Sequence, residues 1–311
     1  MMSEQKYRLV TRSDFDGLVC AVLLKQLNLI DDIKFVHPKD MQDGVIEINS
    51  RDIVTNLPYV AEAHLVFDHH LSETLRNQDN QENHIIDAEA PSAARVVWEH
   101  YGGEETFPSS WIDMMEAVDK GDSAQFTRDE VLDSTGWNLL NFLMDARTGL
   151  GRFRNFRISN YNLMMDLIEY CKNHSIDEIL QLPDVKERID LYREHEVLFK
   201  EQIQRCATVH RNLVLLDLTG EETIYAGNRF MIYALFPQCN ISIHKLWGFQ
   251  KQNTVFATGK SIFDRSSKTN VGELMLKYGG GGHKAAGTCQ IDNDRAEQVL
   301  SELIETITAD G

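Results

Sequence analysis

The chain has 311 residues, of which 42% are hydrophobic and 25% charged, and its formal net charge at pH 7 is −17. This length exceeds the usual size of one domain and predicts two, while the composition is that of an ordinary globular protein. The acidic balance argues against broad binding to duplex nucleic acid, which requires a basic face. A phosphorylated ligand remains compatible with it, because bound cations can invert the charge of a single cleft.

The cysteines and the N-terminus bear on the cellular compartment. The five cysteines lie far apart and form no CxxC pair, which indicates free thiols in a reducing cytoplasm. The N-terminal sequence MMSEQKYRLV lacks the apolar core of a signal peptide, and no apolar run is long enough to cross a membrane. We therefore expect a cytoplasmic protein without a membrane segment.

The chain begins with a predicted strand over residues 7–10, an acidic loop with the sequence SDFDG, and a mostly buried helix over residues 18–29. Asp14 and Asp16 lie in that loop and can offer hard oxygen ligands to a divalent cation. The same string is also typical of a turn or a helix N-cap, since Asp and Gly are favoured at both. Both interpretations stay open at this point.

Further strands are predicted at residues 33–36, 45–48 and 52–58, followed by an apolar run at 65–67 that ends in Asp68, His69 and His70. The carboxyl end of a parallel strand faces the ligand crevice of an α/β sheet. Histidine is the commonest side-chain metal ligand, and a neighbouring carboxylate can fix its tautomer. Two adjacent histidines without such a context would more simply be surface residues at a strand end.

Helices are predicted from Ser92, a plausible cap, to about residue 98 and over residues 111–118, and the second leads into another acidic stretch, DKGDS. The alternation of strands and helices predicts a mainly parallel sheet with helices on both faces. Residues 139–205 are helical in pattern, with one long amphipathic helix over 187–205. A basic cluster in this region can either hold phosphates or pair with nearby carboxylates; it contains Arg147, Arg152, Arg154 and Arg157.

A smaller C-terminal α/β domain is predicted beyond residue 207. Its strands are expected at residues 213–218, 223–226, 232–236, 241–245 and 254–258, and its last helix at 295–307. The segment YGGGGHKAAG at residues 278–287 removes side chains from the backbone, so its N–H groups can approach an anion. His283 and Lys284 add polar and cationic contacts there. A flexible linker would not be followed by HKAAG and a further strand.

The motifs SDFDG, FDHH, DKGDS and GGGGHKAAG, in this order, resemble the DHH phosphoesterase superfamily, in the branch with a glycine-rich DHH-associated C-terminal domain. That branch includes RecJ-type exonucleases, nano-RNases, cyclic-dinucleotide phosphodiesterases and exopolyphosphatase-like proteins. The resemblance implies a catalytic domain over residues 1–185, a linker helix over 186–208 and a substrate-binding domain over 209–311. It also implies a site between the two domains.

The resemblance further implies a two-metal phosphohydrolase that uses Mn²⁺, with Mg²⁺ as the alternative. One metal would be held by Asp14, and the other by Asp16, His69 and Asp122. His70 would face the substrate phosphate, and Asp68 would support the histidines; these two form the catalytic pair. The rest of the substrate would contact Arg265, Gly280, Gly281, Gly282 and His283.

Two positions depart from the family pattern. Val10 stands where the family usually has a histidine, four residues before the first aspartate. The second motif usually supplies a bridging aspartate at a strand end, and the best match here is Asn56, with Asp52 as the alternative. If Asn56 is the match, the first metal keeps only Asp14.

We therefore expect an enzyme that hydrolyses a phosphodiester or phosphoanhydride bond of a small phosphorylated substrate. Its substrate would be an oligoribonucleotide, a cyclic dinucleotide, phosphoadenosine phosphate or polyphosphate, so short single-stranded nucleic acid is among its expected partners. The alternative is a nucleotide- or phosphate-binding protein with weakened catalysis. A family II inorganic pyrophosphatase is disfavoured by GGGGHKAAG. Assembly as a homodimer stays open.

Overall fold

The computed structural model describes residues 6–70 and 81–311. They belong to two compact units, the first made of Met1–Phe126 and Ser134–Asp190 and the second of Thr127–Asp133 and Leu191–Gly311. The first five residues, which formed part of the signal-peptide argument, lie outside the described ranges. None of the helices in those ranges combines the length and the apolar character needed to span a bilayer.

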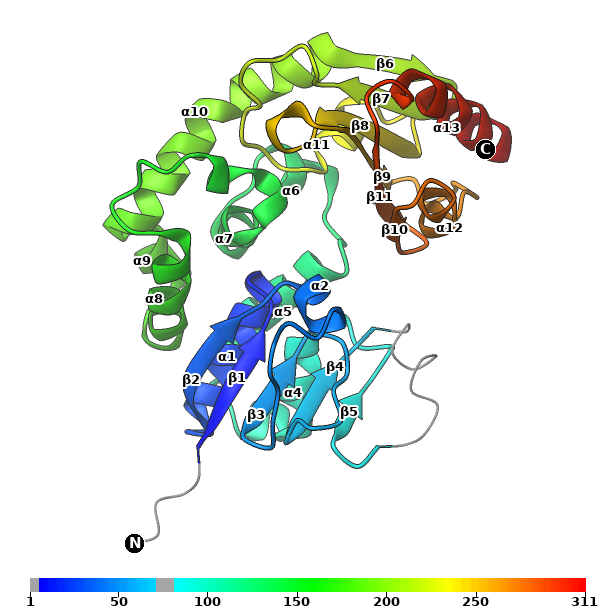
Figure 1. Cartoon of the computed structure of the whole chain (residues 1–311). Helices are drawn as coiled ribbons and strands as arrows, with labels where there is room; N and C mark the ends of the chain where they lie inside the picture. The colour runs from blue at the N-terminus through cyan, green and yellow to red at the C-terminus, as the bar shows by residue number, and fades with distance from the viewer. Residues whose placement is uncertain (1–5, 71–80) are drawn as a thin grey trace, which may run out of the picture. The chain divides into compact units, whose positions relative to one another are not determined.

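The first unit is built on a five-stranded sheet with the order β2-β1-β3-β4-β5 (Figure 1). Its strands are β1 (Tyr7–Thr11), β2 (Ile30–Phe35), β3 (Asp52–Thr55), β4 (Leu65–Asp68) and β5 (His84–Ile86). All neighbouring strands in it are parallel. The mainly parallel α/β sheet predicted from the sequence is therefore confirmed.

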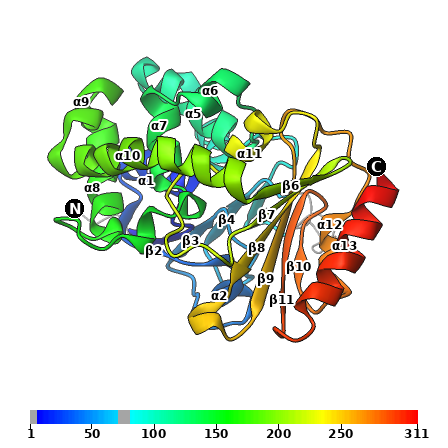
Figure 2. The same ribbon diagram turned by 90° about the horizontal axis from the view of Figure 1, so that it is seen from above.

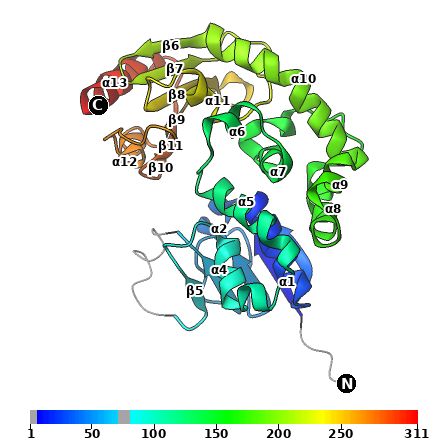
Figure 3. The same ribbon diagram turned by 180° about the vertical axis from the view of Figure 1, so that it is seen from behind.

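The two faces of this sheet are both covered. Val10, Val54 and Val66 stand opposite one another on β1, β3 and β4 and pack with Met41 of α2 (Pro38–Gln42). Alternate residues of a strand point to the other face. There α1 (Phe15–Gln26), α4 (Ala93–His100) and α5 (Ile112–Asp122) lie side by side (Figure 3).

The other elements of the first unit are helical, and from residue 139 onward this agrees with the predicted helical pattern. The α-helices are α7 (Gly136–Met144), α8 (Asn160–Asn173) and α9 (Ile176–Gln181), and the short 3₁₀ helices are η1 (Gly103–Glu105), η2 (Ser109–Trp111), η3 (Ala146–Thr148) and η4 (Leu150–Arg152). The long helix α10 spans Pro183–Cys206 and continues into the second unit. The strand expected over residues 45–48 is absent: this segment has no sheet partner, and its Val45 is 69% exposed.

The second unit has a six-stranded mixed sheet with the order β10-β11-β9-β8-β7-β6. Its strands are β6 (Ala207–His210), β7 (Leu213–Asp217), β8 (Ile241–Trp247), β9 (Thr254–Lys260), β10 (Gly281–Gly282) and β11 (Ala286–Ile291). Only β7 and β8 pair in parallel. Its helical elements are α6 (Arg128–Leu132), α11 (Met231–Leu235), η5 (Phe249–Lys251), α12 (Val271–Leu276) and α13 (Ala296–Asp310).

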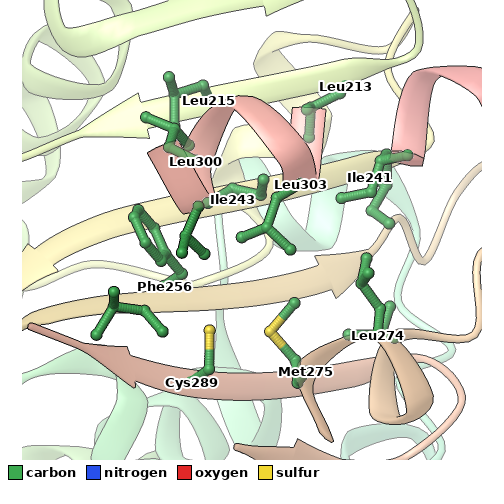
Figure 4. Packing of buried hydrophobic residues seen from close by; sticks show 14 of the residues in the cluster. Leu213, Leu215, Ile241, Ile243, Phe256, Leu274, Met275, Cys289, Leu300 and Leu303 are labelled. Carbon is green, nitrogen blue, oxygen red and sulfur yellow. The ribbon is translucent and has the colours of Figure 1, made fainter. Parts of the chain in front are cut away.

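The core of the second unit forms where α12 and α13 pack on this sheet (Figure 2). Ile243 and Phe256 of the central strands lie in one cluster with Leu303 of α13, and Met275 of α12 lies next to Cys289 of β11 (Figure 4). All five side chains are essentially removed from water. Their burial is the main force that holds this unit together.

Two strands expected in this unit do not form. Residues 232–235 belong to α11 instead and Phe236 is its C-cap, because a short buried apolar run does not distinguish a strand from a helix. The hydroxyl of Tyr233 donates to the Gly259 carbonyl at 2.7 Å and docks this helix on the sheet. Residues 223–226 are also not a strand: the Gln202 side chain of α10 bonds the Thr223 carbonyl and the Tyr225 N–H in place of a neighbouring strand.

Candidate metal centre and active site

The acidic and imidazole side chains identified in the sequence gather at the carboxyl edge of the first sheet. Asp14 and Asp16 follow β1, Asn56 follows β3, and His69 follows β4. Because β1, β3 and β4 are adjacent parallel strands, these loops emerge next to one another. Asp122 reaches the same place from the last turn of α5.

The SDFDG loop has the geometry of a helix N-cap and also presents two carboxylates. Asp14 is the N-cap of α1 and accepts the Gly17 N–H at 3.0 Å. A Cβ at Gly17 would lie 2.1 Å from the Arg12 carbonyl oxygen, so this position requires glycine. Asp16 lies in the first turn of α1 and is only 3% exposed. The two interpretations of this string are therefore compatible.

Asp16 is held in place by the start of a second helix. Its two carboxylate oxygens accept the N–H groups of Ala93 and Ala94, at 3.1 and 2.8 Å, in the first turn of α4. The positive end of that helix favours the ionised carboxylate. Ser92 caps this helix as predicted, by accepting the Arg95 N–H at 3.0 Å. Each oxygen of Asp16 keeps a further lone pair for a cation.

Asp16, His69 and Asp122 form the cluster with the geometry of a metal site. Their ligand atoms all lie within 4.8 Å of one another. Nδ1 of His69 is 3.2 Å from the Ala90 carbonyl oxygen, which makes Nδ1 the protonated nitrogen and turns Nε2 toward the cluster. Nε2 lies 3.0 Å from Asp122 Oδ2, yet it is buried without a hydrogen bond. Such converging, unsatisfied donor atoms fit a divalent cation.

The protonation of this cluster indicates a deficit of positive charge. Burial and the neighbouring Asp122 raise the pKa of Asp16 to about 7. Burial alone would lower the pKa of His69, but the carboxylates of Asp122 and Asp16 outweigh it and raise this pKa to about 9. A cation bound among these groups would supply the missing charge and displace the protons.

Metal binding should accordingly release protons. At pH 7.5 the His69 imidazole, with a pKa of about 9, is protonated in the metal-free protein and must lose its proton to become a ligand. We expect about one proton released per Mn²⁺ and an affinity that rises about tenfold per pH unit between about pH 7.5 and 8.5. Calorimetry in buffers of different ionisation enthalpy measures this release. A proton count of zero would contradict ligation by His69.

Asp68 organises both histidines. It is fully buried, and its Oδ1 accepts the His69 N–H at 2.8 Å and lies 2.7 Å from Nδ1 of His70. This contact turns Nδ1 of His70 toward Asp68 and leaves Nε2 as the nitrogen that can face a ligand. The His70 side chain is 31% exposed, unlike that of Asp68, and can therefore meet a ligand.

The structure separates the two alternatives for the second motif. Asp52 begins β3, at the opposite edge of the sheet, where Arg8 binds both of its oxygens at 2.7 and 2.8 Å. Asn56 follows the end of β3 in a left-handed conformation, with φ of 54°. Its Nδ2 is 3.5 Å from Asp14 Oδ1, and its own Oδ1 is buried without a hydrogen bond. Asn56 is thus the residue beside the site.

The two aspartates of DKGDS have different surroundings. Asp119 accepts the Ser92 hydroxyl at 2.7 Å and the Arg95 Nε at 2.9 Å, which ties α5 to the start of α4. Asp122, one turn later, contacts His69. The motif alone does not distinguish the carboxylate that ties the two helices together from the one that meets His69.

The arginines of the basic cluster also differ in their surroundings. Nε of Arg157 lies 3.4 Å from Oδ1 of Asp184, which fits the alternative of an arginine paired with a nearby carboxylate. Arg147 instead lines a pocket with Asp14, Asp16 and Asp122, and its Nε donates to Asp145 at 2.7 Å. Sequence reasoning also overlooked Arg12, whose Nε is 3.1 Å from Asp14 Oδ2. A basic residue two positions before the first aspartate was the signal for it.

In the second unit, the glycine-rich segment is a hairpin. Gly281 and Gly282 form β10 and pair with Thr288 and Gly287 of β11. A Cβ at Gly280 would lie 2.1 Å from the Thr288 carbonyl oxygen. This position therefore requires glycine because the two backbone segments pack closely there. A Cβ at Gly281, in contrast, would meet nothing within 4 Å.

The hairpin turn ends against α12. The carbonyls of His283 and Lys284 accept the N–H groups of Gly272 and Val271, the first two at the helix start, at 2.8 and 3.2 Å. The side chains of His283 and Lys284 are exposed. Arg265 lies in a different exposed loop, where its Nε donates to the Ile262 carbonyl at 3.4 Å.

No protein-family model matches the chain. The chain is 77% identical to the pGpG-specific phosphodiesterase PggH from Vibrio cholerae, with a TM-score of 0.88, covering 98% of this chain and 100% of that one. RecJ in complex with Mn²⁺ from Thermus thermophilus is 14% identical, with a TM-score of 0.50, and the match covers 98% of this chain and 52% of RecJ. The latter likeness concerns the fold alone.

A curated relative matches a smaller segment. The A-adding tRNA nucleotidyltransferase of Aquifex aeolicus is 27% identical over 117 residues. The match covers 35% of the present chain and only 14% of the relative. It therefore carries no argument about activity.

Proposed function

Because this chain belongs to the DHH phosphoesterase family and is a metal-dependent phosphoesterase of small phosphorylated substrates, we propose that its substrate is pGpG, a linear dinucleotide with a 5′-phosphate. The observation that carries this proposal is the 77% identity to the pGpG-specific phosphodiesterase over the full length of both chains. Hydrolysis of the internal phosphodiester of pGpG consumes one water and gives two molecules of GMP. The acidic net charge of −17 is consistent with a short substrate rather than a long duplex.

In the proposed mechanism Asp16, His69 and Asp122 hold a divalent cation. When bound there, this cation supplies a lowered pKa for water and a positive charge for the phosphoryl oxygens. Carboxylate and imidazole donors suit Mn²⁺, and Mg²⁺ is the second candidate. The Ala93 and Ala94 N–H groups and the Ala90 carbonyl keep two of these ligands in place.

His70 and Asp68 would then act on the substrate side. Asp68 orients the His70 ring through Nδ1, 2.7 Å away, so that Nε2 can donate a hydrogen bond to a phosphoryl oxygen. With its proton on Nε2, His70 can also transfer it to the departing 3′-oxygen. The burial of Asp68 keeps this orientation rigid.

We assign substrate binding outside the reacting phosphate to the second unit. The exposed hairpin with Gly281, Gly282 and His283, together with Arg265, offers backbone N–H groups, an imidazole and a guanidinium for the 5′-phosphate and the bases. The first unit is the catalytic part in this assignment, and α10 joins the two.

Gly281 permits a clean test of this assignment. A side chain there meets no atom of the protein within 4 Å, so Gly281→Val should leave folding and metal binding unchanged. If substrate occupies that space, KM should rise about tenfold with a smaller change in kcat. Steady-state kinetics on pGpG measures both.

A matched control exists in the same unit. Gly220 is also exposed and also has nothing within 4 Å of a Cβ, so Gly220→Val adds the same side chain elsewhere. We expect His283→Ala to behave like Gly281→Val, and Gly220→Val like the unmodified protein. Unchanged kinetics in Gly281→Val would mean that the hairpin has a purely structural role.

The substrate itself is tested with a panel. The purified protein is incubated with Mn²⁺ and, in parallel, pGpG, a longer oligoribonucleotide, a cyclic dinucleotide, phosphoadenosine phosphate or polyphosphate. We expect pGpG to be cleaved to GMP with the highest kcat/KM. Faster cleavage of any other member would replace pGpG as the proposed substrate, and chelation of the metal should stop the reaction in every case.

A further inference from the structure

The first metal position of the family does not fit this chain. Val10, at the position of the usual histidine, is completely buried in an apolar cluster and offers no donor atom. Asn56, at the position of the usual bridging aspartate, carries no charge and directs its Nδ2 toward Asp14 Oδ1 at 3.5 Å. Of the ligands expected at this position, only Asp14 is left.

Asp14 is already surrounded by donors. Its Oδ1 accepts the Gly17 N–H at 3.0 Å, and its Oδ2 lies 3.1 Å from Nε of Arg12. This contrasts with Asp122 and His69, whose facing atoms lie 3.0 Å apart without a hydrogen bond. Asp14 is therefore already contacted by two N–H donors, one of them a guanidinium.

The guanidinium of Arg12 can bind a ligand in addition to Asp14. Its side chain is 30% exposed, and within the part of the chain that the structure describes its guanidinium pairs only with Asp14. The contact uses Nε, so both terminal nitrogens are available to a ligand. A guanidinium fork matches two oxygens of a phosphate. This one is held by Asp14, which itself lines a pocket with Asp16 and Asp122.

We propose that Arg12 takes the place of the first metal, so that this enzyme works with one divalent cation and one guanidinium. The cation lies at Asp16, His69 and Asp122, and Arg12 binds the non-bridging oxygens of the reacting phosphate. A divalent ion at Asp14 would be repelled by the same guanidinium. The inference rests on the proposed function in one respect, namely that the substrate is a phosphodiester.

The chemical step balances without a second metal. The oxygen of water forms the new bond to phosphorus, and the bond from phosphorus to the 3′-oxygen breaks. One proton of the water ends on the departing 3′-oxygen through the enzyme's acid–base groups, and the other passes to solvent. Arg12 keeps its protons throughout and neutralises charge on the phosphoryl oxygens, as donors aimed at such oxygens do.

The first test counts metal ions and needs no substrate. We expect the unmodified protein to bind one Mn²⁺ tightly, measured by electron paramagnetic resonance of free Mn²⁺ during a titration. In Arg12→Ala the tight site should be unchanged, while any weak second binding event should tighten at least about tenfold, because a positive charge beside Asp14 is gone. Arg51→Ala, which removes an exposed arginine of the same unit, is the matched control. Two tight ions in the unmodified protein would overturn the proposal.

The second test uses chemical rescue. Arg12→Ala should lower kcat on pGpG about 100- to 1,000-fold, the usual loss for one such donor. Millimolar guanidinium should restore part of the rate, whereas urea, its neutral counterpart in shape, should not. Arg12→Gln, which keeps a polar side chain of similar length, covers the case in which the alanine variant folds poorly. A loss below threefold, or equal rescue by urea, would exclude a role for the guanidinium charge.

The two tests separate this inference from the proposed function. If the unmodified protein does not cleave pGpG, the substrate assignment fails, while the metal count still decides whether Arg12 excludes the first ion. The kinetic test is then repeated on the best substrate of the panel.

Discussion

Replacing Asp16, His69 or Asp122 with alanine is expected to abolish tight Mn²⁺ binding and to reduce hydrolysis at least about a thousandfold. The expected loss follows from the several kcal/mol of charge stabilisation that a bound metal supplies to the transition state. The three ligand atoms lie within 4.8 Å of one another, so each variant removes one corner of a single site. Calorimetric titration and steady-state rates on pGpG measure the two losses.

The controls for these variants lie on α5, the helix that carries Asp122. Asp113→Asn and Glu116→Gln each remove an exposed carboxylate of α5 and should behave like the unmodified protein. Asp122→Asn keeps the shape of the side chain and should still lose metal affinity. Wild-type metal affinity in all three alanine variants would reject the assignment of the site.

The second large effect concerns the number of metal ions. Val10→His together with Asn56→Asp restores both residues of the family pattern and should add a second, weaker Mn²⁺ next to Asp14. Either change alone leaves the position with too few ligands. Adding Arg12→Ala to this pair should strengthen the second ion further, because the competing cation is removed. Metal analysis of the equilibrated proteins gives the stoichiometry.

The double variant should also be less stable. Val10 is fully buried among apolar side chains, and an imidazole there costs about 2 kcal/mol of unfolding free energy unless a metal binds it. Added Mn²⁺ should therefore raise the melting temperature of the double variant more than that of the unmodified protein. An equal shift in both proteins would mean that the introduced groups do not reach a metal.

The first sheet could be predicted well from the sequence because its strands follow simple rules. β1 and β4 are short apolar runs that end in polar motifs, and a parallel sheet places such ends together. The segment over 45–48 has a similar pattern but lacks a partner strand, which the sequence cannot reveal. At residues 223–226 the side chain of Gln202 takes the backbone hydrogen bonds that a neighbouring strand would otherwise make. Because Gln202 is about twenty residues away in the sequence, a local pattern does not indicate this contact.

The motifs predicted which acidic and histidine residues form the site, but they did not predict the ion pairs that surround it. Motif spacing identified Asp16 and His69, which the structure brings together. The pairing of Arg12 with Asp14 depends on how the loop after β1 turns, and the support of Asp119 by Arg95 depends on packing between two helices. Both are three-dimensional contacts between residues of ordinary type, so the linear pattern can at most name the candidate residues and does not predict the contacts.

The contact between Asp16 and the start of α4 gives this enzyme a built-in reporter. The backbone N–H groups of Ala93 and Ala94 donate to the carboxylate oxygens of Asp16, a proposed metal ligand, with nitrogen–oxygen distances of 3.1 and 2.8 Å. In a two-dimensional nuclear magnetic resonance spectrum, these two signals should shift when diamagnetic Mg²⁺ binds and broaden beyond detection with paramagnetic Mn²⁺. The occupancy of the centre can thus be followed at two alanines, in the absence of any substrate and in variants that have no turnover.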